Sequence, residues 1–138
     1  MGYIGDRNSA EILLDGLERL EYRGYDSAGV AVWKDGQIQV RKLKGRLSAL
    51  KESLEKNPIE GNVGIGHTRW ATHGEPSDLN SHPHNSRDGK IAVVHNGIIE
   101  NYMEIKEELE REGYDFVSET DTEVISHLLD FYYNGDIV

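Results

Sequence analysis

The sequence of 138 residues contains no cysteine. This absence excludes disulfide bonds and metal sites built from thiolates. It also excludes a cysteine nucleophile within these 138 residues. Any catalytic or binding chemistry therefore has to come from residues of other types.

The sequence also lacks long apolar runs and an excess of basic residues. No run approaches the roughly 18 residues of a membrane span, and the first residues do not resemble a secretory signal. Lysine and arginine number 15 against 25 acidic residues, which gives a net charge of -10. We therefore expect a soluble, cytoplasmic protein of one domain with neither a membrane nor a nucleic-acid partner.

Periodicity and turn residues predict a layered protein of helices and strands. The segments expected to be helical are 10–22, 47–55, 101–112 and 122–133. Strands are expected at 27–33, 37–42, 63–68, 91–95 and 115–117, after a short extended piece at 2–5. The Asp-Gly pair at 35–36 predicts a hairpin turn, and Thr120 or Asp121 is expected to cap the last helix.

Three segments place unusual residues in irregular backbone at the ends of strands or helices. They are 22–29, 67–76 and 95–97, with 118–121 at a helix start further along the chain. Ligands of α/β proteins usually bind at such ends. The stretch 70–89 is rich in Gly, Pro, Ser, Asn and His, which indicates a long structured loop, and loops of that length are usually functional.

Four residues in these segments suit the chemistry of an amino-acid amide. Arg69 offers a two-pronged donor for a carboxylate, and Asp121 offers a negative charge for an ammonium group. Together they match the two ends of a free amino acid. Asn96 and the backbone N–H of Gly97 could donate to a developing oxyanion.

Each of these residues also has a structural interpretation. Arg69 and Asp121 could form a structural ion pair, Asp121 could be only a helix cap, and Asn96-Gly97 is an ordinary turn dipeptide. The histidines at 67, 73, 82, 84 and 95 raise a further possibility, a metal site. No pair has the helical HExxH spacing and thiolates are absent, so we predict neither a metal nor another cofactor.

Together the segments resemble the N-terminal glutaminase domain of the glucosamine-6-phosphate synthase family, a class II glutamine amidotransferase domain. The matching stretches are 10–29, 67–76, 82–84, 94–101 and 118–123. The motifs Tyr-Arg-Gly-Tyr-Asp-Ser-Ala-Gly and Thr-Arg-Trp-Ala-Thr-His-Gly are specific to this family. The amidotransferases of purine and asparagine synthesis share only the R-G-x-D and N-G elements. The resemblance covers essentially the whole chain.

The resemblance implies an α+β fold of the N-terminal-nucleophile hydrolase type, a four-layer αββα sandwich that is incomplete in this chain. It also implies a role for each matching residue. Arg69 would bind the glutamine α-carboxylate with help from Thr72 and His73, and Asp121 would hold the α-ammonium. Asn96 and Gly97 would form the oxyanion hole, Trp70 would belong to a mobile loop that closes the site, and Arg23 would support the surroundings of the nucleophile. The family hydrolyses glutamine and passes the ammonia to fructose-6-phosphate.

The first residues depart from the family, which begins with Cys-Gly-Ile-Val-Gly after removal of its initiator methionine. Here Met1 stands where the family has valine, and Cys-Gly-Ile is not present ahead of it. Because that cysteine attacks the glutamine amide, we expect the chain alone to be inactive. A mis-assigned start codon would explain the departure.

Residues 1–138 are therefore expected to form a partial glutaminase domain without the sugar-phosphate isomerase domain. Intact members of the family are expected to be homo-oligomers. The alternative from another functional class is a non-catalytic module that binds glutamine or another amino acid and has kept Arg69 and Asp121.

Overall fold

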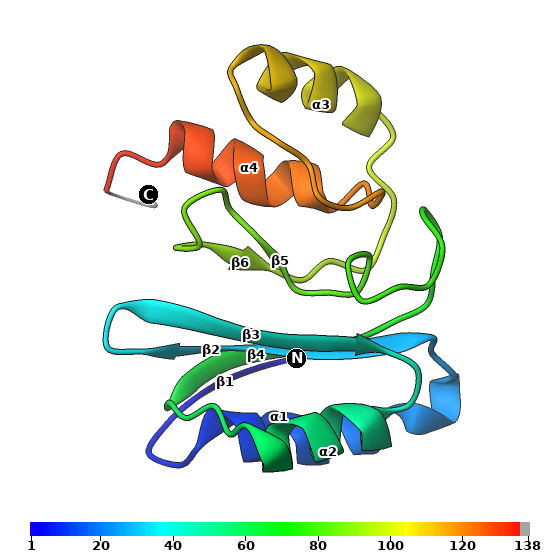
Figure 1. The fold of residues 1–138 in the computed structure, drawn as a ribbon, viewed down its shortest axis with the longest axis vertical. Helices are drawn as coiled ribbons and strands as arrows, with labels where there is room; N and C mark the ends of the chain where they lie inside the picture. Colours follow the sequence, from blue (N-terminus) through cyan, green and yellow to red (C-terminus); the bar gives the residue numbers. More distant parts are fainter. Residues whose placement is uncertain (136–138) are drawn as a thin grey trace.

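The computed structural model describes residues 1–135, so the last three residues of the predicted domain, 136–138, lie outside the described residues. Its elements in chain order are β1 (Gly2–Ile4), α1 (Ser9–Glu18), the 3-10 helix η1 (Glu21–Arg23), β2 (Ser27–Lys34), β3 (Gln37–Lys44), α2 (Leu47–Lys56), β4 (Val63–Arg69), β5 (His84–Asn85), β6 (Ala92–Val93), α3 (Tyr102–Arg111) and α4 (Glu123–Tyr132). Figure 1 shows them in layers: α1 and α2, a four-stranded sheet, the pair β5–β6, and then α4 with α3.

The four-stranded sheet is antiparallel throughout, in the order β1-β4-β2-β3. β2 and β3 are joined by Asp35 and Gly36, which both have positive φ, of 51° and 82°. Two central residues with positive φ define the turn type whose twist matches that of the flanking strands. The hairpin predicted from the Asp-Gly pair is confirmed.

The main core lies between this sheet and the helices α1 and α2. Leu13 and Leu17 lie one turn apart on α1 and are almost fully buried. Opposite them, β4 carries Gly64 and Gly66, and a Cβ added at Gly64 would lie 2.9 Å from Leu13 Cδ1. The absence of side chains at these two positions therefore lets α1 pack closely on the sheet.

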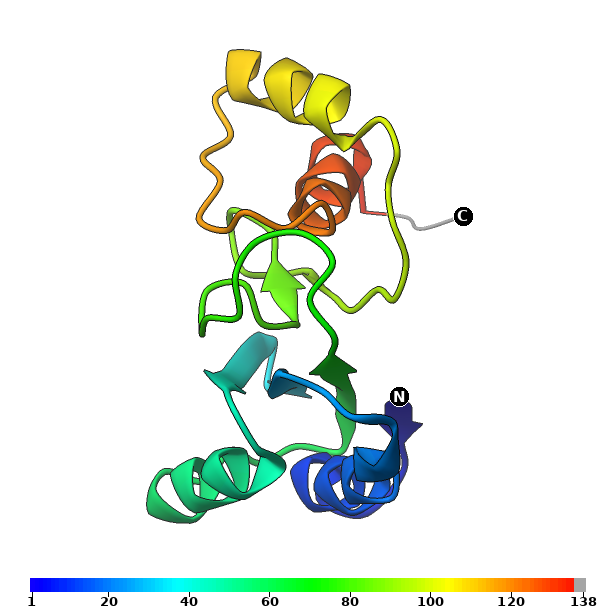
Figure 2. The same ribbon diagram turned by 90° about the vertical axis from the view of Figure 1, so that its right-hand side faces the viewer.

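A second, smaller core lies in the other half of the molecule, where α4 covers β5 and β6 and α3 packs against α4 (Figure 2). Its buried residues are Leu109, Tyr114 and Val124. The α+β class and the layer order αββα are confirmed, with two strands described in the second sheet. Among residues 1–135, no helix has both the length and the apolar character needed to cross a membrane.

Two of the predicted strands are absent or shorter in the structure, because their backbone N–H groups donate hydrogen bonds to side chains. Residues 115–117 form no strand, since a carboxylate oxygen of Glu123 accepts from Val117 N at 2.9 Å. The strand predicted at 91–95 is confined to β6, since the N–H of Ile91 donates to Ser86 Oγ and that of His95 to His82 Nδ1. An amide bonded to a side chain is not available for a β-ladder.

Candidate functional site

Three of the predicted site residues line one hollow beside the start of the chain. They are Arg23, Trp70 and Asn96, and the volume of the hollow is about 340 Å³. Its other lining residues are Met1, Leu17, Leu20, Gly24, Gly66, His67 and Thr68. The structure therefore brings the start of β1, the end of β4 and the Asn-Gly turn to one place, although they are far apart in the sequence.

Trp70 forms one wall of this hollow and packs against the Arg-Gly segment of the first motif. Its side chain is 69% exposed, and a Cβ added at Gly24 would lie 2.9 Å from Trp70 Cζ3. Gly24 also has a φ of 74°, which favours glycine. The Arg23 Nε donates to the Tyr22 hydroxyl at 3.1 Å, which holds the arginine at the rim of the hollow.

Arg69 does not line the hollow but is buried behind it, with 4% of its surface exposed. Its Nη2 donates to the backbone carbonyls of His73 and Gly74, whereas its Nη1 is buried without a hydrogen-bond partner among the described residues. Burial lowers the pKa of Arg69, and the carboxylates of Asp26 and Asp121 act in the opposite direction. A buried guanidinium with an unsatisfied nitrogen is energetically costly, so it suits an incoming anion.

Asp121 is also buried, with 3% exposed, and its Oδ2 accepts the N–H of Ile99 at 2.7 Å. Among residues 1–135 no ion pair within 4.0 Å joins it to Arg69, so the structural ion pair considered above is not formed. The predicted capping role is also wrong: the N-cap of α4 is Thr122, without a side-chain cap bond. Asp121 instead anchors the segment that follows Gly97.

Asn96 and Gly97 are both exposed at the end of the strand region that contains β6. The ring of His95 folds back beside Gly97, where an added Cβ would lie 2.9 Å from its Cε1 and Nε2. His95 Nδ1 lies 3.3 Å from Thr122 Oγ1. A side chain at position 97 would therefore have to push the His95 ring aside.

The other two residues predicted to help Arg69 occupy different environments. Thr72 is exposed, whereas the ring of His73 packs edge-on against Tyr102 at a centroid distance of 5.3 Å. His73 contacts Arg69 through its backbone carbonyl, and its buried Nδ1 has no described hydrogen-bond partner. Thr72 is therefore open to solvent, whereas contact between His73 Nδ1 and a ligand requires the loop to rearrange.

Sequence reasoning missed two residues that hold this loop. Asp26 accepts the backbone N–H of Ala71, and the buried side chain of Asn80 bonds both to Glu75 and to Glu119. Asp26 lies in the predicted segment 22–29, and Asn80 lies in the long loop 70–89. Their role depends on partners distant in sequence, so spacing contained no signal for it.

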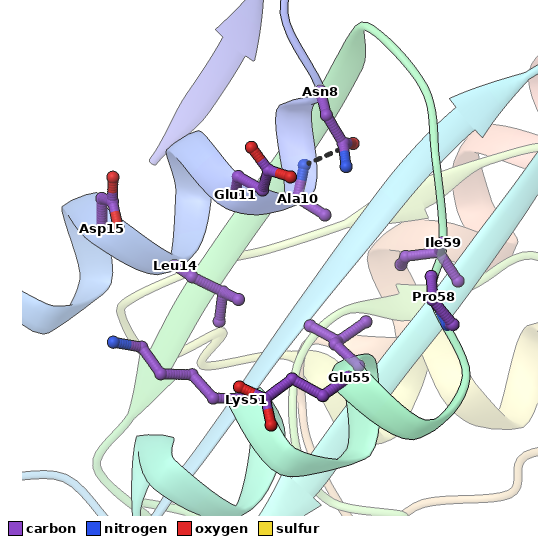
Figure 3. A pocket seen from close by; sticks show the side chains of 10 residues that line it. Asn8, Ala10, Glu11, Leu14, Asp15, Lys51, Glu55, Pro58 and Ile59 are labelled. Atoms are coloured by element: carbon purple, nitrogen blue, oxygen red, sulfur yellow. Dashed lines mark hydrogen bonds between the residues drawn. The ribbon is translucent and has the colours of Figure 1, made fainter.

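A larger hollow of about 430 Å³ lies in a different layer, between α1 and α2 (Figure 3). Its apolar lining residues include Leu14, Leu54 and Ile59. Figure 3 shows Glu11 and Asp15 on the α1 side of the hollow. No residue of the three predicted segments lines it. Its size alone therefore gives it no relation to the candidate site.

Three of the five histidines between positions 67 and 95, namely His67, His82 and His84, form a buried cluster between the sheets. The rings of His67 and His82 stack at 4.5 Å, and His84 lies edge-on to His82 at 4.7 Å. Within residues 1–135, no three His, Asp or Glu side chains are arranged to hold a metal ion. Burial lowers the pKa of His82 to about 2 and that of His84 to about 3.

We expect these histidines to make the fold sensitive to acid. The ordinary histidine pKa is about 6.5, so below this pH the unfolded chain binds protons that the folded chain excludes. Stability therefore falls as the pH falls from about 6.5 towards the folded pKa values. Between pH 7 and pH 5, His82 and His84 together are expected to remove roughly 4 kcal/mol, measured as a lower urea midpoint.

The variant His84→Gln should remove about half of that pH dependence, because glutamine does not titrate in this range. Its side-chain amide can hydrogen-bond to Thr120 Oγ1, which lies 2.9 Å from His84 Nε2 in the structure. Equal urea midpoints at pH 7 and pH 5 for the unaltered chain would contradict the assignment of a neutral, buried histidine cluster.

Comparison with known proteins places this arrangement in a family. The sequence profile of the glutamine amidotransferase domain matches residues 54–135, more than half of the chain. The chain belongs to the glutamine amidotransferase domain family. It is 66% identical over all 138 residues to the glutamine–fructose-6-phosphate aminotransferase (isomerizing) of Caldanaerobacter subterraneus subsp. tengcongensis, and 64% identical to that of Clostridium tetani. It spans 23% of the length of each of these relatives.

The fold of this glutamine amidotransferase domain is also found in a solved structure. Glutamine phosphoribosylpyrophosphate amidotransferase from B. subtilis, complexed with ADP and GMP, superposes with a TM-score of 0.79 at 28% identity. The match covers 99% of this chain and 30% of that one. The N-terminal-nucleophile hydrolase fold predicted from the resemblance is thus confirmed by a relative with much lower sequence identity.

Proposed function

We propose that this amidotransferase domain binds glutamine and forms the glutaminase part of a glutamine–fructose-6-phosphate transaminase (isomerizing). The observation that carries the proposal is the buried Arg69, whose Nη1 has no hydrogen-bond partner among residues 1–135 and whose pKa the Asp121 carboxylate raises. A free amino acid supplies an anionic group for the arginine and a cationic group for the aspartate. The names of relatives that are 66% and 64% identical support glutamine as that amino acid.

In this proposal the loop between Arg69 and Gly74 opens to admit the ligand. Because the His73 and Gly74 carbonyls occupy Nη2, a carboxylate that binds Nη1 and Nη2 together has to displace at least one of them. The His73 ring becomes available to the ligand in the same movement. Trp70 then closes the hollow that Asn96 lines, and the side-chain amide of the ligand accepts from Asn96 and from the N–H of the adjacent Gly97.

We further propose that the chain does not turn over glutamine by itself, because it contains no cysteine to act as the nucleophile. Transfer of ammonia to fructose-6-phosphate is assigned to the isomerase domain of the longer relatives. That domain, a homo-oligomeric assembly and a cytoplasmic location remain predictions for the protein that contains this domain.

Calorimetric titration with glutamine distinguishes this proposal from a non-catalytic amino-acid-binding module. Glutamine binding by the 138-residue chain that stays unchanged when Cys-Gly-Ile is added ahead of position 1 supports the module, whereas binding that appears or tightens on that addition supports the glutaminase. If neither chain binds glutamine, the proposed function is wrong.

The variant Arg69→Lys tests the site in whichever chain binds. We expect the dissociation constant for glutamine to rise at least about tenfold, because lysine cannot make the two parallel bonds of a guanidinium to a carboxylate. The matched control is Arg111→Lys on the exposed surface of α3, where Nε bonds only to the Glu107 carbonyl of the same helix. Unchanged glutamine affinity in Arg69→Lys would remove Arg69 from the site.

A further inference from the structure

Asn80 uses its whole side-chain amide to connect two loops of the candidate site. The residue is 3% exposed. Its Nδ2 donates to the Glu75 carbonyl at 2.8 Å and to Glu119 Oε2 at 3.1 Å, and its Oδ1 accepts from Glu119 N at 2.9 Å. All its donors and its acceptor are thus engaged, which fixes the orientation of the amide.

The first of the two loops covers Arg69. Its carbonyls at His73 and Gly74 accept from the arginine, and Asn80 holds the next carbonyl, that of Glu75. Gly74 has a φ of 75°, and a Cβ added there would lie 2.7 Å from Asn80 Nδ2 and 2.9 Å from Glu119 Cβ. The backbone around Gly74 is therefore packed directly on the connection.

The second loop carries Asp121, two residues after Glu119. Asn80 bonds to both the backbone N–H and the carboxylate of Glu119, so it holds this segment at two points. Asp121 is then fixed from its other side by the N–H of Ile99. One amide side chain thus connects the loop over Arg69 with the segment that carries Asp121.

Asn80 itself rests on the edge of the four-stranded sheet. Lys42 on β3 donates to the carbonyls on either side of it, those of Leu79 at 3.1 Å and Ser81 at 2.8 Å. The N–H of Lys44 donates to Asp78 Oδ1 at 2.7 Å. Because three bonds tie residues 78–81 to β3, the amide is presented from a rigid element rather than from a free loop.

We propose that Asn80 is a positioning residue that sets the separation between the Arg69 guanidinium and the Asp121 carboxylate. It thereby selects ligands that carry both an α-carboxylate and an α-ammonium group over ligands that carry only the carboxylate. This inference rests on the proposed function. Neither the family assignment nor the resemblance gave Asn80 a role.

The test compares two ligands in calorimetric titrations: glutamine and glutaramate, which is glutamine without its α-amino group. Asn80→Asp keeps the shape and the acceptor but replaces the NH2 donor with an oxygen that faces the Glu119 carboxylate. The Kd for glutamine is expected to rise at least about tenfold, while the Kd for glutaramate changes less than about twofold. A fraction of unfolded protein would lower the apparent number of sites instead.

A second variant reverses the polarity of the connection. In Asn80→Asp combined with Glu119→Gln, the new glutamine amide can donate to the new carboxylate, so at least half of the lost discrimination is expected to return. The control Asn57→Asp, at an exposed position after α2, should leave both affinities unchanged.

If Asn80→Asp leaves both ligands unaffected or weakens them equally, the inference is overturned while the proposed function stands. If the double variant regains none of the discrimination, the connection through Glu119 is overturned. If the unaltered chain, with and without Cys-Gly-Ile, binds neither ligand, the proposed function fails and the inference fails with it.

Discussion

Addition of Cys-Gly-Ile ahead of position 1, with valine in place of Met1, is expected to turn this chain into a glutaminase. The 138-residue chain serves as the reference and should release ammonia from glutamine no faster than buffer does. The extended chain should exceed it at least about a thousandfold, because a positioned nucleophile and general base are gained together. Ammonia release is measured with a coupled dehydrogenase assay after mass spectrometry has shown that the initiator methionine is removed.

The register of β1 explains why the added cysteine should reach the candidate site. Gly2 pairs with Ile65 and Tyr3 with Gly64, so each step back along β1 is one step forward along β4. The Met1 amino group donates to the Gly66 carbonyl at 2.9 Å, which continues the same pattern. Three further residues in this register bring the first one opposite Arg69, beside the hollow that Asn96 lines.

The alternation of side chains also gives the direction of the thiol. The Met1 side chain lies against Gly16 of α1, and Tyr3 packs in the same core. Because successive side chains of a strand point to opposite faces, the residue three positions ahead of Met1 points away from α1. It therefore faces the second sheet, where Asn96, Gly97 and Asp121 lie.

The chemistry follows from these positions and from the resemblance. The thiol proton passes to the cysteine α-amine, whose ordinary pKa of about 7.7–8.0 suits a base near neutral pH. In the proposed mechanism, sulfur attacks the amide carbon of glutamine, and we expect Asn96 and the Gly97 N–H to stabilise the oxyanion. Ammonia leaves with the proton, and water then cleaves the thioester to glutamate and restores the thiol.

Two control variants of the extended chain separate this mechanism from nonspecific hydrolysis. Serine in place of the added cysteine should abolish measurable turnover, and Asn96→Ala should lower it by about 10²–10³, the usual effect of losing one oxyanion donor. If the cysteine and serine chains release ammonia at the same rate, the nucleophile does not act where the register places it.

The parts of the fold that could be predicted from the sequence are those set by neighbours along the chain. Apolar periodicity predicted α1 through Leu13 and Leu17, and the pair Asp35 and Gly36 predicted the hairpin because both residues tolerate positive φ. These signals depend on the local backbone alone. They needed no knowledge of which segments meet in space.

The parts that could not be predicted are decided by contacts between distant segments. The apolar residues of 115–117 suggested a strand, but Glu123 takes the amides of Val117 and Ser118 at 2.9 and 2.7 Å. In the site, sequence reasoning named Arg69 and Asp121 but not Asn80, because an asparagine in a loop has no spacing that indicates its partner. The burial of Arg69 under its own loop was likewise not visible in the sequence.

The contact between the two sheets leads to a second large expected effect, for Gly29→Ala. Gly29 lies in β2 on the face towards the second sheet, and an added Cβ would lie 2.1 Å from the His82 carbonyl oxygen and 2.6 Å from Lys42 Cβ. Overpacking usually costs 1–3 kcal/mol, and a clash with backbone lies at the upper end. We expect a loss of about 3 kcal/mol or more in the free energy of unfolding, measured by urea titration.

The backbone near His82 cannot move aside at little cost, because Lys42 holds the preceding carbonyl of Ser81 and the His82 ring stacks on His67. The matched control is Gly2→Ala in β1, where the nearest atoms to an added Cβ lie at 3.9 Å, so its stability should change by less than about 0.5 kcal/mol. Equal midpoints for the two variants would show that the sheets separate easily at this point. Asn80 lies two residues before His82. If Gly29→Ala shifts the backbone at His82 but leaves the protein folded, glutamine binding should therefore also weaken. The packing of the two sheets is in this way coupled to the geometry of the site.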